Sequence, residues 1–403
     1  MNDLGCEKIE WVSKHMPILN NISQDAIKNK VLKGYKIGVC LHIESKKVYL
    51  VKKLIDAGAT VAVCASNPLS TKDDIVSELK DLGAYVYARK GDSEEAYKNC
   101  LQSVADFFPD LYIDDGADLT TVINSNKEIS NHVIGGTEET TTGIIRLKKI
   151  KKLEVPVMAV NDTPMKCMFD NRFGTAQSTI AAFLSTTNMS ISGKKVVICG
   201  YGWCGKGLAS RLKGFGAVVV ICEIDPVKAN EAILDGFMVM KMNDACKVGD
   251  IFITVTGCCD VINMGHIKKM KNQVVLMNSG HFDNEIRVDE LKENSIKNRK
   301  VKDNIEIYTL ESGKEIYLLT EGRLVNLVAG EGHPIEIIDL SFSLQFLALL
   351  YLLENKETIL PGIIRVPDEI DECIAKANLQ NNNVTIDKLS LKQRKYLGIG
   401  DKK

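Results

Sequence analysis

The sequence KVVICGYGWCGKG, residues 195–207, decides the fold of this 403-residue chain. Its first five residues are typical of a buried β-strand, and they lead into a Gly-x-Gly-x-x-Gly motif at Gly200, Gly202 and Gly205, followed by a helical stretch. In such a motif the glycines allow a tight turn, close approach of the backbone to a pyrophosphate, and close packing of helix on strand. The N-terminus of the helix offers unpaired N–H groups to phosphate oxygens. The stretch therefore predicts a dinucleotide-binding unit.

An acidic residue after the next strand indicates which dinucleotide binds. The strand over 217–222 is followed by Glu223, eighteen residues beyond Gly205. A carboxylate at this place accepts hydrogen bonds from the ribose hydroxyls and repels a 2′-phosphate, which favours NAD over NADP. The rest of this doubly wound unit is predicted as two strands, a hairpin and a long apolar helix, over 250–257, 273–280, 305–319 and 335–354.

The first third of the chain predicts a second α/β unit. Short apolar runs alternate with helical stretches, which is typical of βαβ units in a parallel sheet. The predicted strands are 36–42, 59–64, 85–87, 111–113, 132–134 and 156–160. Polar residues follow five of them, namely His42, Asn67, Asp114–Asp115, Glu138–Glu139 and Asn161–Asp162. Since ligands bind beyond the carboxyl ends of such strands, these residues predict a pocket for a polyhydroxylated molecule. The alternative is that Asp and Asn serve only as turn residues after strands.

Composition excludes several classes of partner. Lys and Arg number 51 against 52 Asp and Glu, so no global positive field exists to attract nucleic acid or an acidic membrane. The 12 cysteines form no C-x-x-C pair, which predicts neither a metal site nor a disulfide framework. No signal peptide is expected at the N-terminus, and the apolar run over 346–353 is too short to span a bilayer. A cytoplasmic protein without nucleic-acid or membrane partners is expected.

Several segments, occurring in the same order along nearly the whole chain, resemble the S-adenosylhomocysteine hydrolase family. They are NPLST at 67–71, DDGADLT at 114–120, EETTTG at 138–143, Asn161 and Lys166 with FDN at 169–171, the glycine motif, GHF at 280–282, EGRLVNL at 321–327 and GHP at 332–334. The resemblance implies two Rossmann-like parallel-sheet domains joined by hinges near Gly174 and Pro334. The substrate domain would comprise 1–177 and 334–366, the NAD domain 178–333, and a small C-terminal extension 367–403.

The resemblance also implies the reaction and the assembly. In this family bound NAD removes a hydride from C3′ of a nucleoside thioether, the resulting ketone acidifies the C4′ proton, homocysteine leaves, water adds, and the hydride returns. The reaction is reversible and NAD is regenerated in each turnover. The implied substrate is a small molecule, and the implied assembly is a homotetramer or homodimer.

The matching motifs imply roles for individual residues. Lys166 would be the base near the 3′-hydroxyl, its pKa lowered by burial and by the positive nicotinamide. The implied catalytic residues are His42, Asp115, Glu139, Asn161, Lys166, Asp170 and His281. The implied substrate-binding residues are Glu44, Lys46, Asn67, Asp115, Glu139, Lys166, Asp170 and His333. The implied cofactor-binding residues are Thr140, Thr141, Thr142, Asn171, Gly200, Gly202, Trp203, Cys204, Gly205, Lys206, Gly207, Glu223, Lys228, Thr256, Gly257, Ser279, Gly280, His281, Asn326 and His333.

Two substitutions near His42 bear on which base is bound. Animal members of the family have threonine and glutamate where this chain has Glu44 and Lys46. A carboxylate facing N1 and an ammonium facing position 6 complement hypoxanthine better than adenine. We therefore hypothesise that S-inosylhomocysteine is preferred. The alternative is that Glu44 and Lys46 pair with each other or face solvent.

Two further departures concern the cofactor. Longer members continue beyond the end of this sequence into a segment that reaches the neighbouring subunit's NAD, for which Lys402 or Lys403 could partly substitute. Lys228 stands where many members have asparagine beside the ribose of NAD, which could soften the discrimination against NADP.

Two other functions compete with the hydrolase. A plain NAD-dependent dehydrogenase of a small hydroxy or amino acid would account for residues 195–223, but not for Asp115, Glu139, Lys166 and Asp170. A non-catalytic NAD-sensing relative is the second alternative, and it would need none of these four side chains for chemistry.

Overall fold

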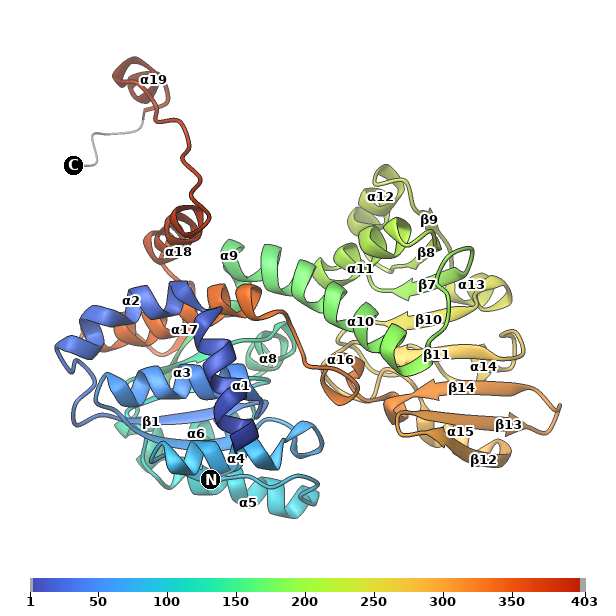
Figure 1. Ribbon diagram of the computed structural model, residues 1–403, viewed down its shortest axis with the longest axis horizontal. Coiled ribbons are helices and arrows are strands. Elements are labelled where there is room, and N and C mark those ends of the chain that lie inside the picture. The colour runs from blue at the N-terminus through green and yellow to red at the C-terminus, as the bar shows by residue number, and fades with distance from the viewer. Residues whose placement is uncertain (1–2, 399–403) are drawn as a thin grey trace.

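The chain folds around two separate β-sheets, which lie at opposite ends of the molecule (Figure 1). The structure is a computed structural model and describes residues 3–398, so Lys402 and Lys403 lie outside the described residues. The first sheet belongs mainly to the N-terminal third of the chain, and the second sheet is formed entirely by the middle of the chain.

The first sheet has seven parallel strands in the order β15-β6-β5-β4-β1-β2-β3. The strands are β1 Lys36–Leu41, β2 Thr60–Ala65, β3 Tyr85–Tyr87, β4 Leu111–Asp114, β5 Gly135–Glu138, β6 Pro156–Ala159 and β15 Gly362–Ile364. The central strands are almost wholly buried, as expected for a parallel sheet covered on both faces by helices. The predicted strand over 132–134 was wrong, because helix α7 extends to His132, with Asn126 capping its first turn, and β5 begins only at Gly135.

The second sheet contains the glycine motif and has eight strands in the order β12-β13-β14-β11-β10-β7-β8-β9. The strands are β7 Lys195–Cys199, β8 Val218–Cys222, β9 Met238–Val239, β10 Ile251–Thr254, β11 Val274–Asn278, β12 Ser295–Lys302, β13 Ile305–Leu310 and β14 Glu315–Leu319. Its six parallel strands follow the order of a dinucleotide-binding fold. The predicted doubly wound α/β class and the hairpin β13–β14 are confirmed, whereas the exposed strand β12 was not predicted.

Helices cover both faces of each sheet. Those associated with the first sheet are α1 Asp3–Lys14, α2 Pro17–Lys28, α3 Ser45–Asp56, α4 Asp73–Asp81, α5 Glu94–Ala105, α6 Asp118–Ser125, α7 Lys127–His132, α8 Thr141–Leu147, α17 Ile335–Glu354 and α18 Asp368–Asn381, with 3-10 turns at Pro68–Ser70 and Val160–Asp162. Those of the second sheet are α11 Trp203–Gly214, α12 Pro226–Leu234, α13 Met242–Val248, α14 Met264–Ile267, α15 Val288–Glu293 and α16 Val325–Val328, with a 3-10 turn at Thr320–Gly322. The last helix, α19 Leu391–Tyr396, lies apart from both sheets (Figure 1).

Two crossings connect the sheets. The first is a helical segment made of α9 Pro164–Lys166, a π-helix at Cys167–Gly174 and α10 Thr175–Thr187. The π-helix is an uncommon element that often occurs at functional sites. In the second crossing the chain returns through residues 329–334 into α17, which packs into the core of the first sheet.

Helix α17 is long and apolar enough to span a membrane by length and composition, with a mean hydropathy of 1.7. It is longer than the 346–353 run considered from the sequence. Two thirds of its apolar window is buried inside the fold, against β4, β5 and α2. Its apolar character is therefore explained by its place in the core.

Candidate active site

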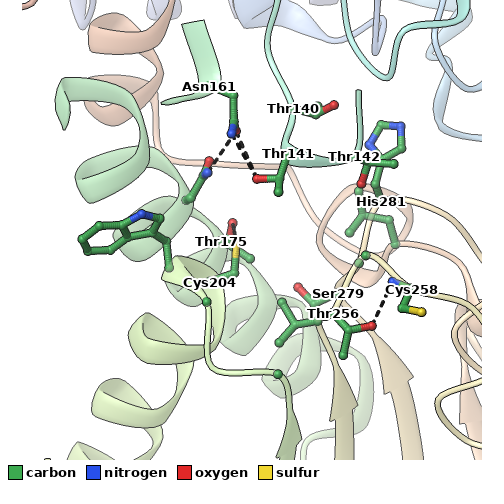
Figure 2. Close-up of a pocket in the computed structure, with 18 of the residues that line it drawn as sticks. Thr140, Thr141, Thr142, Asn161, Thr175, Cys204, Thr256, Cys258, Ser279 and His281 are labelled. Atoms are coloured by element: carbon green, nitrogen blue, oxygen red, sulfur yellow. Dashed lines mark hydrogen bonds between the residues drawn. The ribbon is translucent and has the colours of Figure 1, made fainter. Parts of the chain in front are cut away.

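A cavity of about 1130 Å³ lies between the two sheets, where the carboxyl ends of their strands face each other. Figure 2 shows Thr140, Thr141, Thr142 and Asn161 on one side of it and Thr256 and Ser279 on the other. The structure places nearly every predicted site residue in the cavity lining: His42, Glu44, Lys46, Asp115, Glu139, Thr140, Thr141, Thr142, Asn161, Lys166, Asp170, Asn171, Gly200, Gly202, Trp203, Cys204, Lys206, Glu223, Lys228, Thr256, Gly257, Ser279, Gly280, His281, Asn326 and His333.

Asn67, Gly205 and Gly207 are the predicted residues that do not line the cavity. The side-chain oxygen of Asn67 accepts a hydrogen bond from the Leu69 N–H at 2.9 Å, so this residue caps the following 3-10 turn instead of facing a ligand. Gly205 and Gly207 act through packing. A β-carbon on Gly205 would lie 2.1 Å from the carbonyl oxygen of Gly200, and one on Gly207 would lie 1.7 Å from that of Arg172.

In both pairs of adjacent acids, Asp114–Asp115 and Glu138–Glu139, the two members have different roles. The first member of each pair is buried and holds the backbone of its loop. Asp114 accepts hydrogen bonds from the N–H and hydroxyl of Thr120, both at 2.7 Å, and Glu138 accepts from Gly116 and Ala117 N–H at 3.0 and 2.9 Å. The second members, Asp115 and Glu139, line the cavity.

Lys166 lies at the centre of a buried polar network that continues from α9 into the π-helix. Its Nζ atom donates to Asn171 Oδ1 at 2.7 Å and lies 3.2 Å from Asp170 Oδ2. Asn171 in turn donates to Asn161, which exchanges hydrogen bonds with Thr141 (Figure 2). The network fixes the lysine between the two sheets.

The charges around Lys166 correct one expectation. Burial lowers its pKa, as expected, but the carboxylates of Asp170 and Glu139 raise it by more, so the pKa of Lys166 lies above its ordinary value. The expected lowering is therefore wrong for the protein alone. Asp170 also hydrogen-bonds His333 and Ser341, and its pKa is lowered despite burial because Lys166 and His333 stabilise the carboxylate.

His42, Asp115 and His281 form a second cluster. His42 Nε2 lies 3.6 Å from Asp115 Oδ2, and His281 Nδ1 lies 3.9 Å from Asp115 Oδ1. Burial lowers the pKa of His42 to about 4, with Asp115 opposing that shift. Burial raises the pKa of Asp115, but His42 and His281, together with Lys47 and Lys166, bring it below its ordinary value. A neutral imidazole beside a carboxylate can exchange protons with a ligand, and the three side chains also have a spacing that could hold a metal ion, which the sequence did not predict.

Glu44 and Lys46 pair with each other and also line the cavity. Lys46 Nζ lies 2.7 Å from Glu44 Oε2 and donates to the carbonyl oxygen of Glu331, also at 2.7 Å. Both side chains are more than nine-tenths buried. The alternative in which they face solvent is therefore wrong, and the alternative in which they pair is confirmed.

Lys47 was not among the predicted site residues, but it is buried and lines the same cavity. Its Nζ atom donates to both carboxylate oxygens of Glu139, at 3.1 and 3.0 Å, and lies 4.5 Å from the centre of the Phe342 ring. The signal that could have found it is its position in the first turn of the helix that follows His42. A lysine there reads as an ordinary exposed helix residue unless the helix N-terminus is known to face a cavity.

The second sheet offers a site that fits NAD. Gly200 has a φ of +107°, which supports the tight turn before α11. Glu223, at the end of β8, is held by hydrogen bonds from Tyr201, Ile224 and Asp225 N–H groups. The side-chain oxygen of Asn326 is buried in the cavity lining and has no hydrogen-bond partner among residues 3–398, while its nitrogen donates to Ser178 at 3.0 Å. A nicotinamide carboxamide would supply a donor for this oxygen.

Three other predicted cofactor residues have partners within the protein. Trp203 begins α11, and Lys206 Nζ lies 4.9 Å from the centre of its ring and 2.6 Å from Glu231 Oε1. Lys228 Nζ lies 3.8 Å from Asp225 Oδ2, on the side of the cavity that holds Glu223.

Comparisons with known proteins agree with this geometry. Residues 1–133 match the model of the S-adenosyl-L-homocysteine hydrolase family, and residues 171–332 match that of its NAD binding domain. The chain is 49% identical over 397 residues to the adenosylhomocysteinase of Thermotoga maritima, covering 98% of both chains. It is 47% identical over 397 residues to the S-inosyl-L-homocysteine hydrolase of Methanocaldococcus jannaschii, covering 98% of this chain and 95% of that protein.

Among solved structures, a dipicolinate synthase chain from Bacillus halodurans matches 80% of this chain and 99% of its own, with a TM-score of 0.50 and 14% identity, which shows a shared fold alone. The family is shown by the two family models and by 49% identity to a member over nearly the full length of both chains. The chain belongs to the S-adenosyl-L-homocysteine hydrolase family, with NAD as its cofactor.

Proposed function

We propose that this protein hydrolyses a nucleoside thioether, S-adenosyl- or S-inosyl-L-homocysteine, to the nucleoside and L-homocysteine. One observation carries the proposal: Lys166, Glu139, Asp170 and the cluster around Asp115 lie in the same cavity as the NAD residues of the second sheet. A plain dehydrogenase needs a dinucleotide site and one acid or base, and a cofactor sensor needs no such set.

The residues of the cavity divide the reaction among themselves. When bound, NAD supplies reversible removal of a hydride from C3′ of the ribose, which makes the C4′ proton acidic. Lys166 would take and return the proton of the 3′-hydroxyl. Glu139 and Asp170 would accept hydrogen bonds from the ribose hydroxyls. Asp115 and His42 would move protons near C4′ and C5′, where the thiol leaves and water adds.

The chain itself would hold NAD with residues from both sheets. Glycines of the 200–207 loop would face the pyrophosphate, Glu223 the adenosine ribose, and Asn326 the carboxamide. Thr142 supports a shared site, since its hydroxyl is the nearest side-chain atom to a β-carbon built on Gly257, at 3.5 Å. Cofactor and substrate would therefore be enclosed together and water excluded from the oxidised ribose.

We propose that the base bound is hypoxanthine in preference to adenine. The relatives include both activities at similar identity: S-inosyl-L-homocysteine hydrolases at 46–47% and adenosylhomocysteinases at 44–49%. Glu44 and Lys46 pair with each other in the cavity wall, but the pairing does not exhaust their hydrogen-bonding capacity. Glu44 and the carbonyl oxygen of Glu331 take two of the three N–H donors of Lys46, so one donor is left for a ligand, and the Glu44 carboxylate keeps further lone pairs as an acceptor beside it. Hypoxanthine offers an N1–H donor and an O6 acceptor in the same adjacent arrangement.

The deciding experiment supplies each thioether to the purified protein without added NAD and follows free thiol. Thiol release without net formation of NADH identifies the hydrolase, and a higher kcat/KM for the inosyl compound identifies the base. No thiol from either compound, or NADH formed in step with an added alcohol, contradicts the proposal.

We propose a substrate domain of residues 1–177 and 334–366, an NAD domain of 178–333 with hinges near Gly174 and Pro334, and an extension of 367–403. A homotetramer or homodimer in the cytoplasm is proposed, supported by α19, which lies apart from the body and leaves Leu391 and Tyr396 exposed at 72% and 91% (Figure 1). Sedimentation velocity on the purified protein tests the assembly.

A further inference from the structure

Two lysine–carboxylate pairs face the cavity from different elements of the first sheet's domain. Lys166 of α9 pairs with Asp170 of the π-helix at 3.2 Å, and Lys47 of α3 pairs with Glu139, which follows β5, at 3.0 Å. All four side chains are at least nine-tenths buried. The proposed reaction gives roles to Lys166, Asp170 and Glu139 but none to Lys47.

We infer that Lys47 is a positioning residue: it holds Glu139 in one orientation and keeps this carboxylate from pairing with Lys166. The inference rests on the proposed function for its effect on turnover. The contact between Lys47 and Glu139 itself does not depend on that function.

The position of Lys47 shows that the contact with Glu139 must be favourable. Lys47 lies in the first turn of α3, where the helix dipole disfavours a positive charge. Its head group is nevertheless drawn inside, over the face of Phe342 from α17 and against both oxygens of Glu139. A buried ammonium needs a partner in such a place, and Glu139 provides it.

Glu139 depends on Lys47 in the same way. Among residues 3–398, Lys47 is the side chain that hydrogen-bonds its carboxylate, and it does so through both oxygens. Two parallel contacts fix the plane of the carboxylate and leave its remaining lone pairs free for ribose hydroxyls. Without Lys47 the carboxylate would turn toward Lys166.

The contact between Lys47 and Glu139 affects Lys166, because Glu139 and Lys166 lie in one cluster of charged groups. Glu139 is faced by Lys47 from α3, Asp115 after β4, Lys166 from α9 and Asp170 from the π-helix. Lys166 is faced by Asp170, Glu139 and Cys204 of α11. Because Glu139 raises the pKa of Lys166, a cation bound to Glu139 limits that effect and favours the neutral, basic form of Lys166.

The first test compares Lys47→Gln with the wild-type holoenzyme. Lys47→Gln is expected to lower kcat/KM about tenfold and to move the acidic limb of the pH profile upward by about one unit. The matched control is Lys52→Met, a partly exposed lysine of the same helix paired with Asp56, which should leave both unchanged. A folded Lys47→Gln enzyme with a wild-type pH profile overturns the inference.

A double-mutant cycle asks whether Lys47 acts through Glu139. Adding Lys47→Gln to Glu139→Gln should cost less than about twofold in kcat/KM, because the partner is already gone. Losses that multiply independently overturn the inference, since they place the effect of Lys47 elsewhere.

The last readout needs no turnover. In holoenzyme labelled with ¹³C at glutamate carboxyls, the Glu139 signal is the one missing from Glu139→Gln, and its pKa should rise in Lys47→Gln. An unchanged Glu139 titration overturns the inference even if the enzyme is active. Conversely, wild-type protein that releases no thiol contradicts the proposed function, while this titration still decides the role of Lys47.

Discussion

The Nζ atom of Lys166 lies 3.2 Å from Oδ2 of Asp170, and both side chains are at least 95% buried in the cavity between the sheets. Together with Glu139, this contact holds the pKa of Lys166 above its ordinary value even though burial acts to lower it. Lys166, the base of the proposed reaction, is therefore mostly protonated at neutral pH.

This relationship predicts that turnover rises with pH. A base acts in its deprotonated form, so kcat/KM should increase from pH 6 toward pH 9 as that form of Lys166 becomes more populated. Lys166→Met should lower kcat at least about a hundredfold and remove the rise. The measurement is a pH profile of thiol release, with NAD retention as the check on folding. A Lys166→Met enzyme with a wild-type profile would assign the base to another residue.

Lys46→Met should affect the two substrates unequally. The variant leaves Glu44 buried without its cation and removes the donor proposed for O6 of hypoxanthine. One unsatisfied buried polar group costs about 1–3 kcal/mol, so kcat/KM for the inosyl thioether should fall about 10- to 100-fold and that for the adenosyl thioether less. Lys72→Met is the control, because Lys72 binds the side chain of Glu331, 2.6 Å away, outside the cavity. Equal losses for both substrates count against the hypoxanthine proposal.

Gly207→Ala should destabilise the contact between the glycine-loop helix and the segment that joins the sheets. The new β-carbon would lie 1.7 Å from the carbonyl oxygen of Arg172, so α11 and the π-helix must separate. Overpacking of this kind costs about 1–3 kcal/mol, measurable as a lower urea midpoint together with weaker NAD retention. Gly214→Ala, at the end of the same helix with open space around it, should be neutral. Equal urea midpoints for the two variants would show that α11 does not need this close approach.

His42 predicts a loss of stability in mild acid. Its pKa is about 4 in the folded protein and about 6.5 when unfolded, so between these values only the unfolded state takes up a proton. The associated stability is fully present above pH 6.5 and is lost as pH falls toward 4, by up to about 3 kcal/mol. Urea unfolding at pH 7 and pH 5 should therefore show a larger drop for the wild type than for His42→Asn. His15→Asn, outside the cavity, should behave as the wild type; equal drops in all three would contradict this assignment.

The sequence by itself determined the features that depend on neighbouring residues. The glycine motif, the strand before it and Glu223 after the next strand are fixed by local spacing, and they predicted both the fold of the second sheet and NAD. The doubled acids at the ends of β4 and β5 predicted which edge of the first sheet faces the cavity, since carboxyl ends of parallel strands share one edge.

Only the tertiary structure decided how those residues divide their roles, because contacts between distant segments set burial and charge. Which acid of each pair faces the cavity depends on loops that Asp114 and Glu138 hold from within. The raised pKa of Lys166 depends on two carboxylates that the fold brings close to it. The role of Lys47 could be recognised only from the packing of α3 against Glu139. The sequence shows which ionisable groups are present, but the free energy of each buried charge depends on the groups that lie next to it in space.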